Sequence, residues 1–92
     1  MKIKILYFGR PSENLKLADE IVDVPASVAT LGQLLEWLQA RGENWARELT
    51  EGRVRCAINQ EFADWSAALK DNDEVALFSP ISGGRDERDD TA

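Results

Sequence analysis

Apolar and polar residues alternate near the start of the chain, and this pattern predicts a β-strand over residues 2–8. The run becomes continuously apolar toward its end, which is typical of a strand that is buried there on both faces. Gly9 and Pro11 then predict a loop. A second alternating run predicts another strand at residues 20–24, and two strands joined by a loop suggest an antiparallel pair.

The clearest helix is predicted over residues 30–41, where four leucines form one apolar stripe at helical spacing: Leu31, Leu34, Leu35 and Leu38. Thr30 and Gln33 have the spacing of a capping box, in which each side chain bonds to a free backbone N–H group. Gly42 is placed as the C-cap of this helix. A second, short helical turn is predicted at residues 44–49.

The second half of the chain predicts further strands. Residues 54–58 and 74–78 are mostly apolar runs, and residues 61–65 suit a short strand between them. The acidic residues at 71–73 are better explained as turn formers than as a metal site. Because the first and last strands carry the longest apolar runs, we expect them side by side at the centre. The fold class is therefore α+β, with a mixed sheet packed against one main helix.

Length and charge limit the function. The chain has 92 residues, enough for one domain, and it carries 11 Lys+Arg against 17 Asp+Glu, a net charge of -6. This acidic balance argues against nucleic acid as a partner. No apolar run approaches the roughly 18 residues of a membrane span. We therefore expect no membrane partner and a cytoplasmic location.

The absence of histidine restricts the chemistry further. The chain has no histidine and one cysteine, Cys56, which excludes Ser-His-Asp catalysis and four-cysteine metal sites. Cys56 lies in an apolar strand without an evident base, so it is interpreted as an inert core thiol. No bound cofactor and no metal are expected. Most ways for so small a chain to act as an enzyme on its own are closed.

The C-terminal segment carries the most informative pattern. After the last predicted strand, residues 79–84 form an expected extended arm that ends in Gly83-Gly84. Glycine has no Cβ, so such an end can thread a narrow slot in another protein. Residues 85–92 are polar and predicted to be a disordered tail. On the dipeptide alone, a simple flexible hinge is the commoner interpretation.

Three segments in order resemble one family. Residues 71–84, DNDEVALFSPISGG, resemble the C-terminus of the small subunit of molybdopterin synthase, which usually ends in D-G-D-E-V-A-x-F-P-P-V-x-G-G. Residues 51–60, EGRVRCAINQ, are similar to a second motif of that family, and residues 4–9 match its first strand. These are ubiquitin-like sulfur carriers of the MoaD/ThiS family. The resemblance implies a β-grasp carrier domain at residues 1–84.

The resemblance also implies a role and partners. An E1-like adenylating enzyme would use ATP to activate the carboxylate of Gly84, which follows Gly83, and a persulfide would convert it to a thiocarboxylate. The large subunit of molybdopterin synthase would take this sulfur for the pterin precursor of the molybdenum cofactor. The chain would be a sulfur donor rather than a catalyst on its own.

Two positions depart from the family pattern. Ser79 replaces the first proline of the usual Pro-Pro, which makes the arm somewhat less stiff. Gly84 is followed by Arg85, so its carbonyl is held in a peptide bond and cannot be adenylated. A processing protease that removes residues 85–92 is therefore a further expected partner.

The resemblance places partner-binding residues at Phe8, Phe62, Phe78, Pro80 and Ile81. Burial in the core is the usual fate of phenylalanine, and the pattern leaves both readings open for the two that end strands. Phe62 lies in a polar stretch, which favours exposure. An exposed cluster would mark a docking site.

Two alternatives stay open on the sequence. One is a related carrier that feeds cysteine or thiazole synthesis. The other is a ubiquitin-like binding module without sulfur chemistry, in which the phenylalanine surface binds a partner and Gly83-Gly84 is only a hinge.

Overall fold

The computed structural model describes residues 1–80, so Ile81, Gly83, Gly84 and the tail at 85–92 lie outside the described residues. The elements follow the order β1 (Lys2–Tyr7), α1 (Arg10–Leu15), β2 (Asp19–Asp23), α2 (Leu31–Gln39), α3 (Glu43–Glu48), β3 (Arg55–Ile58), β4 (Glu61–Ala63) and β5 (Asp73–Phe78). No helix in this part of the chain is long and apolar enough to cross a bilayer.

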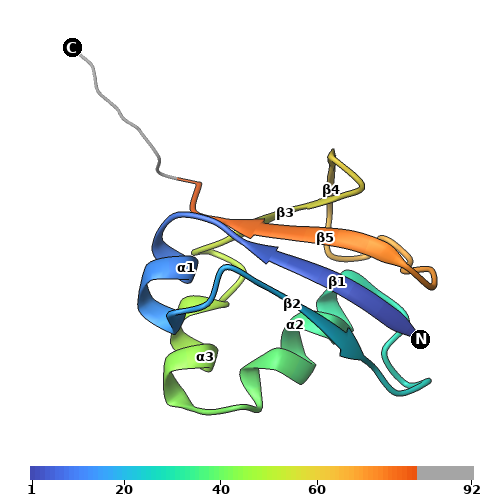
Figure 1. Cartoon of the computed structure of the whole chain (residues 1–92), viewed down its shortest axis with the longest axis horizontal. Coiled ribbons are helices and arrows are strands. Elements are labelled where there is room, and N and C mark those ends of the chain that lie inside the picture. The colour runs from blue at the N-terminus through green and yellow to red at the C-terminus, as the bar shows by residue number, and fades with distance from the viewer. Residues whose placement is uncertain (81–92) are drawn as a thin grey trace.

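The five strands form one mixed sheet in the order β2-β1-β5-β3-β4. β1 and β5 pair in parallel at the centre, and the other three pairings are antiparallel. This confirms both the antiparallel first pair and the central position of the first and last strands. The helices lie on one side of the sheet (Figure 1).

α2 supplies the main helical part of the core. Thr30 and Gln33 form the predicted capping box: the Thr30 hydroxyl accepts from the Gln33 backbone N–H, and the Gln33 side chain accepts from the Thr30 backbone N–H. The four predicted leucines are all buried, and they join one core with strand residues such as Ile5 and Leu77. The packing of one main helix against a mixed sheet is confirmed.

The predicted C-cap at Gly42 is wrong. α2 ends earlier, and its C-cap is Ala40 in a right-handed conformation. Gly42 instead precedes α3 as its N-cap, with φ 155. The chain turns directly from one helix into the next, and this positive φ is a conformation that glycine adopts at little cost.

Two expectations for the segment after β1 are also corrected. The predicted loop contains the short helix α1, whose first turn accepts Pro11 because the missing N–H of proline would have no helical partner there. The far end of β1 is not buried on both faces: Tyr7 is buried, but Phe8 is 51% exposed. The difference arises because helices cover one face of the sheet only (Figure 1).

The uncovered face of the sheet follows from the strand register. Successive side chains of a strand point to opposite faces. In β1 the buried Ile3, Ile5 and Tyr7 face the helices, so Leu6 and Phe8 face the other way. We call this second side, which the helices leave uncovered, the open face.

Candidate partner-docking site

An apolar patch lies on the open face. Across neighbouring strands, Leu6 pairs with Ala76, Ala76 with Ala57, and Ala57 with Phe62, which makes a continuous apolar row. We define the open-face patch as this row together with the two phenylalanines at the strand ends: Leu6, Phe8, Ala57, Phe62, Ala76 and Phe78.

The phenylalanines are the most prominent members of the open-face patch. Phe62 is 82% exposed and Phe8 is 51% exposed, while Phe78 is half-buried. The rings of Phe62 and Phe78 lie 5.9 Å apart between centroids, in a tilted arrangement. The expected exposure of Phe62 is confirmed. Of the two phenylalanines whose burial the sequence left open, Phe8 is exposed and Phe78 is half-buried. Such a cluster is typical of a protein–protein contact.

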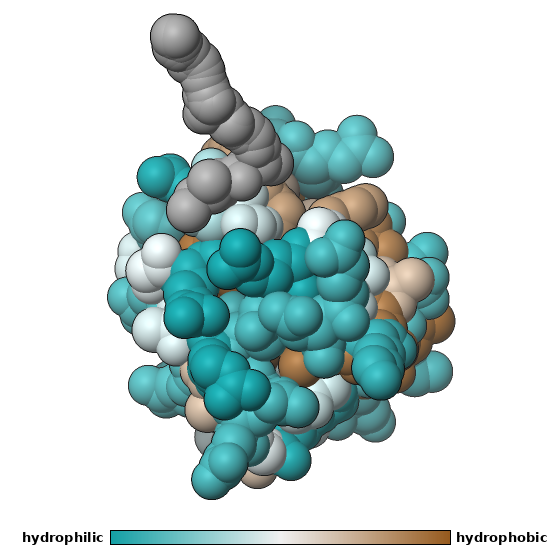
Figure 2. Space-filling view, turned by 90° about the vertical axis from the view of Figure 1, so that its left-hand side faces the viewer, coloured by the Kyte–Doolittle hydropathy of each residue, from teal (hydrophilic) through white to brown (hydrophobic). Residues whose placement is uncertain are grey.

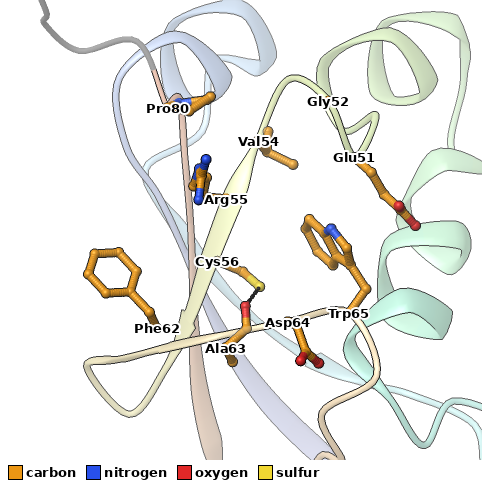
Figure 3. Close-up of a pocket in the computed structure, with 10 residues that line it drawn as sticks. All are labelled: Glu51, Gly52, Val54, Arg55, Cys56, Phe62, Ala63, Asp64, Trp65 and Pro80. Atoms are coloured by element: carbon orange, nitrogen blue, oxygen red, sulfur yellow. Dashed lines mark hydrogen bonds between the residues drawn. The ribbon is translucent and has the colours of Figure 1, made fainter.

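The chain leaves the sheet beside this patch. Pro80 is exposed and follows β5, and it lines two grooves. The larger groove has a volume of about 350 Å³ and extends along β3 to Phe62 and Trp65 (Figure 3). The smaller groove, of about 230 Å³, lies toward α1 and includes Arg10 and Ser79. The end of β5 therefore joins an apolar surface to two recesses that Pro80 lines.

Cys56 lines the larger groove but does not suit nucleophilic chemistry. The residue is 2% exposed, and its thiol donates to the carbonyl oxygen of Ala63 at 3.2 Å, drawn as a dashed line in Figure 3. Burial, with a smaller effect from Asp64, raises the pKa of the Cys56 thiol to about 11. The thiol therefore stays protonated near neutral pH, as the inert interpretation predicts.

A hydrogen-bonded turn holds β3, β4 and β5 in register. Asn59 and Gln60 form a two-residue hairpin with positive φ at both positions, 51 and 73. The Asn59 side chain donates to Asp73 Oδ1 at 2.9 Å and accepts from the backbone N–H of Glu74 at 3.0 Å. Asp73 is buried and also accepts from the backbone N–H of Lys70. This turn presents Phe62 on the open face.

The predicted turn formers act through hydrogen bonds. Asp71 accepts from the backbone N–H of Lys2 at 2.7 Å, which ties the start of β1 to the turn before β5. Within residues 1–80 there is no cluster of three potential ligands that could hold a metal ion.

A polar cluster on the helix side fixes β1 and β2 against the helices. The Tyr7 hydroxyl donates to Glu20 Oε2 at 2.7 Å, and Arg41 donates to both oxygens of the same carboxylate. The Arg41 guanidinium also stacks on Trp45, 4.6 Å from the ring centroid. Burial raises the pKa of Tyr7, and the hydrogen bond to Glu20 raises it further. Arg41 thus connects the helices to β2, beyond the end of α2.

The arrangement is that of a small ubiquitin-like β-grasp domain, with helices on one face of a mixed sheet and the last strand, β5, at its centre. A model of the ThiS family matches residues 5–84, and the chain belongs to that family. The match ends at Gly84.

Relatives and solved structures agree with this assignment. The chain is 33% identical over 82 residues to the molybdopterin synthase sulfur carrier subunit of Escherichia coli, covering 89% of this chain and 99% of the relative. It is similar to a putative molybdopterin converting factor subunit 1 from Pyrococcus furiosus, with TM-score 0.74, 28% identity and coverage of 88% and 99%. It also resembles a chain in the complex of subunits 1 and 2 of molybdopterin-converting factor from Helicobacter pylori, with TM-score 0.64, 25% identity and coverage of 91% and 100%.

Proposed function

We propose that this chain is a sulfur carrier of molybdopterin synthesis, which bears sulfur as a thiocarboxylate on Gly84. The observation that carries the proposal is the coincidence of two features at one end of the sheet. The central strand β5 leads directly into the segment that ends in Gly83-Gly84, and the open-face patch lies beside its exit. The similarity to carrier subunits over nearly their whole length supports the same role.

The chemistry proceeds in three steps after a protease releases residues 85–92. The freed Gly84 carboxylate attacks the α-phosphorus of ATP in an E1-like enzyme, which gives an acyl adenylate and pyrophosphate. A protein persulfide then attacks the acyl carbon, AMP leaves, and an acyl disulfide forms. Finally a thiolate cleaves the S–S bond, which leaves the thiocarboxylate on Gly84 and a new disulfide on the donor side.

The described residues suit a reagent rather than a catalyst. The thiol of Cys56 is buried and protonated, and the sequence has no histidine to act as a general base. The open-face patch serves to dock the carrier on the adenylating enzyme and on the large subunit of the synthase. The arm then delivers the terminal glycine to each active site in turn.

The first test is the intact mass of the untagged protein isolated from its own cells. The proposal predicts a mass that ends at Gly84, with a fraction in which one oxygen is replaced by sulfur. A mass that retains residues 85–92 throughout, beside an active adenylating enzyme, would contradict it. Gly84→Ala separates the carrier from a pure binding module, because only the carrier loses activation while both retain partner binding.

A further inference from the structure

We infer that Arg10, Arg53 and Arg55 form a basic collar around the base of the arm, which docks an acidic segment of the partner protein. This inference rests on the proposed function, because it concerns the same docking end of the carrier. It adds a charged contact to the apolar one of the open-face patch.

The three arginines line the two grooves that share Pro80, where the chain leaves the sheet. Arg10 begins α1 and lines the smaller groove with Arg53, Ser79 and Pro80. Arg55 lines the larger groove, again with Pro80, and it pairs directly with Phe78 across β3 and β5. Figure 3 shows the Arg55 side chain next to Pro80, beside β5. Two segments distant in the sequence, the start of α1 and residues 53–55, therefore bring positive charge to the grooves that Pro80 lines.

These guanidinium groups are exposed and have no partner among residues 1–80. All three arginines are exposed, and none of their side chains takes part in a hydrogen bond or ion pair within the described residues. The two other arginines in that part of the chain are engaged: Arg41 binds Glu20, and Arg47 donates to Asn44. The unpaired arginines are thus gathered at the arm.

Three carboxylates line the same two grooves, but within residues 1–80 none of them forms an ion pair with a collar arginine. Glu48 in the smaller groove is 5% exposed and accepts from the Asn14 amide at 2.8 Å. Glu51 and Asp64 line the larger groove near Trp65, across from Arg55 in Figure 3. Figure 2 views this end of the molecule and shows hydrophilic side chains over most of it. The collar thus holds three guanidinium groups without an ion pair among residues 1–80, on a chain with a net charge of -6.

The charge distribution selects an acidic protein segment as the occupant. A nucleic acid would be repelled by the net charge of -6, since its phosphates need a basic surface over many contacts. The collar is continuous with the open-face patch through the Arg55–Phe78 pair, so one protein partner can cover both. Guanidinium groups at the rim of a contact act mainly on the association rate and its salt dependence.

The test compares two pairs of substitutions that remove the same charge. Arg10→Gln/Arg53→Gln removes two positive charges at the arm. Lys2→Gln/Lys70→Gln removes two exposed charges at the opposite end of the central strands, where β1 begins and β5 follows the turn. Arg55 is left unchanged because it also contacts the open-face patch. Circular dichroism and thermal unfolding first establish that both variants fold.

Association with the large subunit of the synthase is measured by stopped flow at low and high salt. We expect the collar variant to associate about 3–10-fold more slowly than the wild type at low salt, with the difference vanishing at high salt. The lysine variant should stay within about twofold of the wild type. Equal effects of the two pairs, or a loss that is the same at both salt concentrations, would overturn the inference.

A second comparison separates the partner from the chain's own acidic tail. The assay is repeated with the full chain and with a chain that ends at Gly84, which keeps every core residue and strand pairing described here. A collar effect in both forms supports the partner, and an effect confined to the full chain assigns the collar to the tail instead. Failure of the wild type to bind the large subunit at all would contradict the proposed function, which is a different result.

Discussion

The hydrogen bonds of Asn59 give the sharpest test of how the sheet is held together. Asn59→Ala removes a side-chain donor to the buried carboxylate of Asp73 and an acceptor for the backbone N–H of Glu74. The first bond is to a charged group and contributes about 1.5–3 kcal/mol, and the second contributes about 0.5–1.5 kcal/mol. Alanine also tolerates φ 51 less well than asparagine, by about 1 kcal/mol.

These contributions are not fully additive, so we expect Asn59→Ala to lower the free energy of unfolding by about 3 kcal/mol. The matched control is Asn72→Ala. Asn72 has φ 70, but its side chain makes one exposed hydrogen bond, to Asp71 at 3.4 Å. The control should therefore cost only about 1 kcal/mol, most of it from the left-handed conformation.

The assay is urea and thermal unfolding followed by circular dichroism. A difference of about 2 kcal/mol between the variants corresponds to a Tm difference of about 8–16 °C in a domain of this size. Equal losses in the two variants would refute the reasoning, because the backbone cost is matched and only the bonds to β5 differ. Asn59→Ala should also weaken binding of the large subunit through Phe62, because the turn that contains Asn59 positions the Phe62 ring on the open face.

Four further outcomes are expected. Phe62→Ala should weaken binding of the large subunit at least about tenfold without loss of Tm. The control is Ile21→Ala, which should not weaken binding, because Ile21 is 70% exposed but lies on β2, the edge strand opposite β4. Equal binding of both variants would exclude the open-face patch as the docking surface. Gln60→Gly should raise the free energy of unfolding by about 0.5–1 kcal/mol in urea titration, because glycine adopts φ 73 without strain. A decrease in the free energy of unfolding would contradict this prediction. Cys56 should react with a thiol reagent only after urea is added, and rapid labelling of the native protein at neutral pH would contradict its burial. The free energy of unfolding should fall as pH rises above about 10, because the pKa of Tyr7 is higher in the folded than in the unfolded chain. Tyr7→Phe should reduce this dependence of Tm on pH. An unchanged dependence in the variant would contradict the role given to Tyr7.

The local elements could be read from the sequence because their signals are local. The leucine spacing and the capping box of Thr30 and Gln33 define α2 without any knowledge of its partners, and the structure confirms both. The end of that helix could not be read in the same way. Gly42 looks like a C-cap, but the direct turn into α3 makes it an N-cap.

Short elements were harder to predict for the same reason. Pro11 within a polar run favours a loop on the sequence alone. The structure has α1 there because Pro11 and Leu15 pack against the rest of the domain, which stabilises a helix too short to form by itself.

The sequence by itself predicted the order of the five strands, the helix α2 and the central pairing of the first and last strands. What only the tertiary structure decided is which side chains share a surface. The register of β1, β3, β4 and β5 points three phenylalanine side chains to the open face: Phe8, Phe62 and Phe78. A shift of one residue in any strand would move its side chains to the other face, and periodicity within a strand does not fix its register against a strand far away in the sequence.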